Sequence, residues 1–186
     1  MAERRKSENV MQTFTLIHVV ISLIGILSGF VVLFGMLAGK RFNGWTGVFL
    51  ATTVATCVTG FGFPFDHLLP SHKVGIISLV VLAVAIFARY RRNLAGAWRK
   101  TYVVSALLAL YLNVFVLIVQ AFLKIPALKN IAPTPNDPPF KLTQLVVLAT
   151  FIALGIVAAI RFRNEPVRSP QSGQSRANHS SIAAHD

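Results

Sequence analysis

The stretch FTLIHVVISLIGILSGFVVLFGMLAG, residues 14–39, is an apolar run that contains one histidine, His18, and no Asp, Glu, Lys or Arg. At a rise of about 1.5 Å per residue, a helix of this length crosses the ~30 Å hydrocarbon layer of a bilayer. Four more apolar stretches of similar length follow, with no charged residue in their interiors. We therefore predict an all-α bundle of five transmembrane helices, at about residues 14–39, 44–63, 72–90, 102–125 and 142–162.

The composition also indicates a chain whose surroundings are mostly lipid. Hydrophobic residues make up 54% of the 186 residues and charged residues only 13%, whereas soluble domains carry about 25% charged residues. We predict a polar N-terminal tail over residues 1–12, one transmembrane domain over residues 13–163 and a basic C-terminal tail over residues 164–186. The C-terminal tail has almost no large apolar residues, so we expect it to be disordered.

The formal net charge of +12 raises the question of a nucleic-acid partner. However, the Lys and Arg residues stand at the ends of apolar stretches, and no basic groove with interleaved aromatic residues is visible. Cations at membrane boundaries determine orientation and contact anionic headgroups. We therefore expect the partner of these residues to be the lipid bilayer, including its anionic lipids, and we expect no nucleic acid.

The distribution of positive charge predicts how the chain is oriented. With five spans, seven basic residues lie on the side of the N-terminus: Arg4, Arg5, Lys6, Lys73, Lys124, Lys129 and Lys141. Eleven lie on the side of the C-terminus: Lys40, Arg41, Arg89, Arg91, Arg92, Arg99, Lys100, Arg161, Arg163, Arg168 and Arg176. Because positive charge favours the cytoplasm, we predict a bacterial inner-membrane protein with its N-terminus outside and its C-terminus cytoplasmic.

The segment between the last two predicted spans, residues 126–141, is rich in proline: Pro126, Pro133, Pro135, Pro138 and Pro139. Proline at this density does not continue a helix and favours extended or turn geometry. The segment is either a stiff lid over the outer face or an ordinary connector between helices, and the residues alone leave both interpretations open.

Polar side chains concentrate toward one side of the predicted bundle. In the first span, four polar or small residues share one helix face: His18, Ser22, Gly25 and Gly29. The two glycines allow another helix to approach closely. Successive spans cross the membrane in opposite directions. Each of the other four spans therefore has a polar residue at about the depth of His18: Thr59, His72, Gln120 and Gln144. Because a histidine within an apolar span is costly without a partner, His18 is the strongest functional candidate.

One interpretation of this layer is a redox site. Two imidazoles on different membrane helices are the usual axial ligands of a b-type haem, and His18 with His72 is the pair that the sequence offers. The amides of Gln120, Gln144 and Asn113 would then fix imidazole tautomers, or bind haem propionates or a quinone carbonyl. This interpretation makes the chain a redox membrane protein that binds haem b or quinone.

Two other interpretations use the same residues. Imidazole and carboxylate ligands suit zinc, copper or iron, which suggests a metal site formed by His18, Asp66, His67 and His72. Alternatively, His18 forms a hydrogen bond with Gln120, Gln144 or a threonine and only holds the helices together, since polar residues often join membrane helices.

Several function classes are disfavoured by the acidic residues, all six of which lie outside the predicted spans. A proton-coupled carrier usually needs carboxylates within its bundle, and no hydrolase triad can be identified. The sequence therefore favours a non-enzymatic or accessory membrane protein, whose polar layer stabilises the bundle or receives a small ligand. It would act alone, as a homo-oligomer or in a membrane complex. A subunit of an oligomeric small-solute permease is a further alternative.

Three blocks of sequence carry a resemblance: TGFGFPF at residues 59–65, PSHKVG at 70–75 and YLNVFVLIVQ at 111–120. Over about residues 14–162 the chain resembles small bacterial multi-pass membrane proteins of unknown function. It is also loosely similar to the helix bundles of b-type cytochromes. The first resemblance implies a multi-pass protein of the inner membrane, and the second implies haem b as the cofactor.

Overall fold

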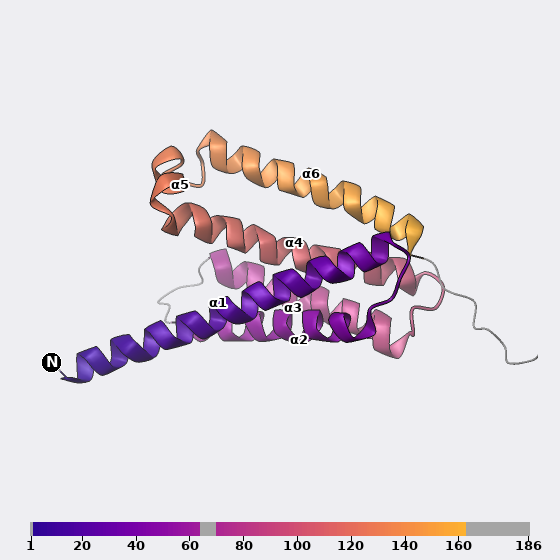
Figure 1. Ribbon diagram of the computed structural model, residues 1–186, viewed down its shortest axis with the longest axis horizontal. Coiled ribbons are helices and arrows are strands. Elements are labelled where there is room, and N and C mark those ends of the chain that lie inside the picture. Colours follow the sequence, from indigo (N-terminus) through magenta and orange to yellow (C-terminus); the bar gives the residue numbers. More distant parts are fainter. Residues whose placement is uncertain (1, 64–69, 163–186) are drawn as a thin grey trace, which may run out of the picture.

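The computed structural model describes residues 2–63 and 70–162, which form helices joined by short connections (Figure 1). No strand occurs in these two ranges, so the all-α prediction is confirmed. The helical elements are α1 (Ala2–Leu37), α2 (Asn43–Gly60), α3 (Pro70–Ile86), the π-helical turn η1 (Phe87–Arg91), α4 (Trp98–Lys124), α5 (Pro126–Ile131) and α6 (Pro138–Arg161).

Four helical stretches are long and apolar enough to cross a membrane: Glu3–Leu37, His72–Arg91, Trp98–Lys124 and Pro138–Arg161. Their outer faces keep large apolar side chains exposed. On α6, Leu145, Val146 and Ile160 are 62%, 63% and 64% exposed. Extended apolar faces of this kind suit contact with lipid. The length and composition of these four stretches are therefore those that a multi-pass membrane protein requires.

The second predicted span, residues 44–63, corresponds to α2, which is not one of these four stretches. This helix has only 18 residues, and five of them are threonines, which lower its hydropathy. Four of the threonine hydroxyls donate to the backbone carbonyl four residues earlier, as Thr52 does to Val48 (2.7 Å). The helix thus satisfies most of its own polar side chains without water.

Helices α1 to α4 lie side by side, each running opposite to the one before it, and α6 packs against α4 and α1 (Figure 1). Consequently α2 and α4 end where α3 and α6 begin. We call this the histidine end of the bundle, because His18 and His72 lie toward it. The opposite end, where α1 ends and α2 begins, is called the arginine end after Arg41, Arg89 and Arg92.

The tightly packed core lies in the half of the bundle nearest the arginine end. Its largest fully buried side chains include Leu33, Met36, Phe49, Leu82, Tyr102, Leu110 and Phe162. Gly29 makes close packing possible there, since a Cβ at this position would lie 2.5 Å from Leu110 Cδ1 and 2.9 Å from Phe49 Cε2. This geometry agrees with the close helix approach predicted from the glycines of the first span.

Two boundaries differ from those predicted. Helix α1 begins at Ala2 and not near Phe14, because residues 2–13 contain several good helix formers and neither proline nor glycine. The prediction of an extended or turn connection over residues 126–141 is wrong in part, since α5 and the start of α6 fall within it. Prolines stand in the first turn of both helices, where the N–H that proline lacks would have no intrahelical partner.

Candidate functional site

A cavity of about 550 Å³ lies between α1, α2, α3 and α4 in the half of the bundle nearest the histidine end. Four of the residues predicted to bind a cofactor line it: His18, His72, Asn113 and Gln120. They come from three helices that are far apart in the sequence. The volume falls within the ~300–1,000 Å³ range of small-molecule sites, so this cavity is the candidate site of the protein.

The hydrogen bonds around His18 determine its tautomer. Thr59 Oγ1 donates its single proton to the backbone carbonyl of Ala55 (2.7 Å). It can therefore only accept from His18, whose Nδ1 lies 2.8 Å away. From these distances we assign to a neutral His18 the tautomer with its proton on Nδ1 and its lone pair on Nε2. A histidine oriented in this way can accept a proton or ligate a metal through Nε2.

The two histidines each pack against a phenylalanine that follows α2. The ring of Phe63 meets the His18 ring edge-on, with centroids 5.2 Å apart. The ring of Phe61 lies 5.7 Å from that of His72, which is only 4% exposed. The segment after α2 thus supplies one aromatic wall to each imidazole.

One face of α4 provides a row of cavity residues at helical spacing: Asn113, Leu117, Gln120 and Lys124. Asn113 lies farthest from the histidine end, where its Nδ2 donates to Thr53 Oγ1 (3.2 Å). Gln120 lines the cavity, is an exposed residue and forms no hydrogen bond with any other residue in the described ranges. The cavity therefore has an amide committed to helix packing at its inner end and a second amide that is available to a ligand.

The cavity residues that were not among the predicted site residues include Cys57, Ser78 and Lys124. Cys57 and Ser78 are 8% and 5% exposed and come from α2 and α3. Lys124 was interpreted only as a charge at the membrane boundary. Its position four residues after Gln120, on the same helix face, is the signal that could have placed it in the site.

Gln144 lies at a similar depth but in a different environment. It is 9% exposed, and its Nε2 donates to the backbone carbonyl of Phe115 (3.2 Å). This hydrogen bond joins α6 to α4, and Gln144 does not line the cavity. The structure therefore does not bring Gln144 together with the other predicted site residues.

The predicted metal site is only partly visible. Asp66 and His67 lie outside the described residues, whereas His18 and His72 line the cavity. Within residues 2–63 and 70–162, no group of three or more His, Cys, Asp or Glu side chains is arranged as ligands of a metal ion. Residues inside the described ranges therefore do not form such a centre by themselves.

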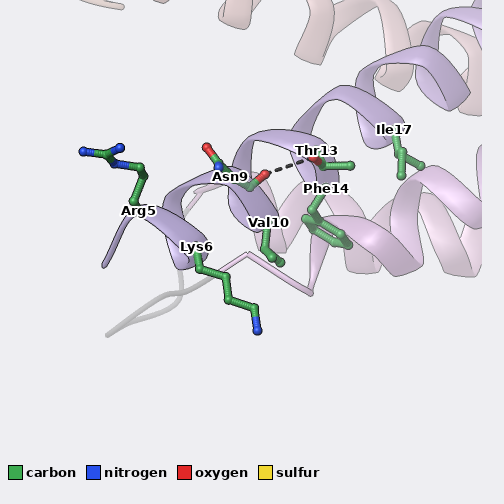
Figure 2. A pocket seen from close by; sticks show the side chains of 7 residues that line it. All are labelled: Arg5, Lys6, Asn9, Val10, Thr13, Phe14 and Ile17. Carbon is green, nitrogen blue, oxygen red and sulfur yellow. Dashed lines mark hydrogen bonds between the residues drawn. The ribbon is translucent and has the colours of Figure 1, made fainter. Parts of the chain in front are cut away.

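A second hollow, of about 810 Å³, runs along the first turns of α1 (Figure 2). All of its lining residues belong to that one helix, among them Arg5, Lys6 and Phe14. Figure 2 shows that the Arg5 and Lys6 side chains extend away from one another. No second described element supplies a lining residue, so we regard it as a surface groove.

Comparison with known proteins provides no relative from which to transfer a function. No protein-family model matches the chain, and no curated protein or solved structure matches it significantly. The cavity and its lining residues are therefore the basis for the functional assignment.

Proposed function

We propose that this chain is a non-enzymatic membrane protein that binds one small molecule in the cavity between α1, α2, α3 and α4. The observation that carries this proposal is the convergence of polar side chains on that cavity from otherwise apolar helices. Polar groups at membrane depth are costly, and groups that served packing alone would bond to one another, as Asn113 does to Thr53. Gln120, by contrast, faces the cavity without a described hydrogen-bond partner.

The proposed protein crosses the membrane five times, with α2 as the second span. α1 and α3 both run from the histidine end toward the arginine end. The chain must therefore return between them, and α2 is the element that makes this return. Its 18 residues extend for about 27 Å, close to the hydrocarbon thickness. The inward-facing threonines, with their hydroxyls satisfied by the helix backbone, make this less apolar helix acceptable within the bundle.

The proposed location is the bacterial inner membrane, with the N-terminus outside and the C-terminus cytoplasmic. Eight cations of the described ranges belong to the arginine end: Lys40, Arg41, Arg89, Arg91, Arg92, Arg99, Lys100 and Arg161. A cytoplasmic arginine end follows from the preference of positive charge for that side. It also brings these cations into contact with anionic headgroups.

The binding proposal is tested by native mass spectrometry of the protein purified in a mild detergent. We expect a noncovalent adduct of defined mass. Val116→Trp fills the cavity from α4 and should reduce the adduct about tenfold or more. Val104→Trp is the matched control, because Val104 is on the same helix and 58% exposed. If both variants retain the adduct equally, the proposal is wrong.

A variant with a larger side chain in the cavity can also fail to fold. Thermal unfolding of both variants in the same detergent reports on this directly. If Val116→Trp is unfolded, Ala121→Phe replaces it, since Ala121 lines the cavity nearer the histidine end.

A second candidate function is the binding of haem b or a quinone. It is favoured by the presence of both imidazoles on one cavity and by the bond to Thr59, which leaves Nε2 of His18 available as an axial ligand. His72 would be the opposite ligand for haem. Gln120 would donate to a haem propionate or to a quinone carbonyl.

The visible absorption spectrum after expression with ample haem tests this second candidate. A Soret band that disappears in both His18→Ala and His72→Ala would support axial ligation by these residues. A normally folded protein without such a band would exclude haem. Loss of thermal stability in the two variants, without any spectral change, would assign the histidines a structural role.

A further inference from the structure

The cavity extends along the helix axes. Its lining on α4 extends from Leu112 to Lys124, which corresponds to about 18 Å of helix. Its lining on α1 extends from Thr15 to Ile26, about 16 Å. We call this cavity, whose volume is about 550 Å³, the channel. Its length suits an extended chain.

The polarity of the channel changes along its length. Near the histidine end, the lining includes the side chains of His18, Gln120 and Lys124. Farther in, α1 and α4 contribute the aliphatic side chains of Leu23, Ile26, Leu112 and Val116. The lining there also includes Ser22, Thr56, Cys57 and Ser78, and the hydroxyls of Ser22 and Thr56 donate to carbonyls of their own helices. The amide of Asn113 is also there, but it donates to Thr53. An occupant therefore meets hydrogen-bonding groups at one end and mostly hydrocarbon along the rest.

The charge at the polar end is positive. Lys124 contributes its ammonium group to this end of the lining, from an exposed position four residues after Gln120 on α4. The described ranges contain three acidic residues, Glu3, Glu8 and Asp137, and none of them lines the channel. An anionic head bound beside this ammonium group forms charge-assisted hydrogen bonds, which are about twice as strong as neutral ones. A neutral head would leave this cation without a countercharge from a bound molecule.

We infer that the occupant is a single-chain amphiphile with a carboxylate head, of the long-chain fatty-acid class. This inference rests on the proposed small-molecule function of the cavity. The carboxylate pairs with the Lys124 ammonium and accepts a hydrogen bond from the Gln120 amide. His18 Nε2 accepts a hydrogen bond from the head when the head is a protonated carboxylic acid. The acyl chain extends along α4 toward Val116.

Photo-crosslinking tests this inference with the full-length protein in phosphatidylcholine nanodiscs. The probes are palmitic acid with a diazirine in its chain and the corresponding alcohol, which has the same chain and an uncharged head. We expect the acid to label channel residues such as Leu23 and Val116, about tenfold more than the alcohol does. Lys124→Gln should abolish this preference, whereas Lys141→Gln, an exposed lysine outside the channel, should retain it.

The outcomes separate this inference from the proposal on which it rests. Two results would contradict the inferred carboxylate head: equal labelling of the channel by the acid and the alcohol, or labelling by the acid that is unchanged in Lys124→Gln. Either result would leave the proposed binding cavity intact. If both probes label only lipid-facing residues such as Leu27, and Val116→Trp has no effect, neither a fatty acid nor a binding cavity is supported. Labelling by the acid that is lost in both Lys124→Gln and Val116→Trp supports the inference in full.

Discussion

At the scale of single residues, Thr59 controls what His18 can do. The threonine uses its only proton on the backbone of α2 and so accepts the Nδ1 proton of the histidine. This arrangement leaves the lone pair of the neutral imidazole on Nε2. The partner of His18 is thus a threonine, one of the structural alternatives that the sequence suggested, and this bond is itself compatible with a binding role for the other nitrogen.

The first prediction concerns this hydrogen bond. Thr59→Val removes the acceptor and leaves an imidazole N–H unsatisfied, so we expect a loss of about 1–2 kcal/mol in the free energy of unfolding. We also expect the His18 proton to distribute over both nitrogens, as reported by ¹⁵N NMR of the imidazole. Thr52→Val is the matched control, because the Thr52 hydroxyl bonds only to its own helix backbone. Equal effects of the two substitutions would argue against the assigned tautomer.

The second prediction concerns the closest helix approach. Gly29→Val places methyl groups where Leu110 and Phe49 already lie, since even a Cβ would be 2.5 Å from the former. Overpacking of this kind typically costs about 1–3 kcal/mol, and thermal unfolding in detergent should show the loss. Gly47→Val provides the comparison, because a Cβ at Gly47 meets nothing within 4 Å. That variant should change stability by no more than about 0.5 kcal/mol.

At the scale of elements, α2 is the helix whose role depends most on its neighbours. Taken alone, it is short and rich in threonine. In the bundle its buried residues Phe49, Leu50 and Cys57 face the adjacent helices, and its hydroxyls are internally bonded. Placing a threonine-rich helix in a membrane would normally cost free energy, because its hydroxyls lose their hydrogen bonds to water. In the bundle this desolvation cost is small, because a hydroxyl that is already bonded within its helix does not require water.

The third prediction is that the two flanks of α2 lie on opposite sides of the membrane. Cys57 is the only cysteine, so Cys57→Ser gives a background for Gly44→Cys and Lys73→Cys, both at exposed positions. A membrane-impermeant maleimide added to spheroplasts, in which the inner membrane is intact, should label Lys73→Cys. It should reach Gly44→Cys only after lysis. Labelling of both positions from one side would show that α2 does not cross.

At the scale of the whole molecule, positive charge and aromatic rings gather at the arginine end. Arg89 donates to Asn43 Oδ1 (2.7 Å) and lies over the Tyr102 ring, 5.3 Å from its centroid. Arg92 lies 5.0 Å from the centroid of Trp98. Contacts between cations and aromatic faces hold these guanidinium groups in place. Arg89 in η1 and Arg92 directly after it are therefore both fixed at the arginine end.

The fourth prediction is the orientation of the molecule. A fluorescent protein fused to the C-terminus should fluoresce, and an alkaline phosphatase fused there should be inactive, because positive charge favours a cytoplasmic arginine end. Replacing Arg91, Arg92 and Lys100 together by Gln should weaken this bias and give a mixed population. Active phosphatase on the unaltered protein would reverse the assigned orientation.

The sequence by itself determined that the chain is helical, that its helices suit a membrane and that polar residues gather toward one side. These are properties of apolar run length and of position along each run, and they hold whatever the helices pack against. Only the tertiary structure decided which of the polar residues act together. Gln144 has the right depth but faces α4 from α6, whereas Lys124 joins His18, His72 and Gln120 on one cavity. The reason is that shared depth follows from counting residues, whereas a shared site depends on helix rotation and on which helices are neighbours.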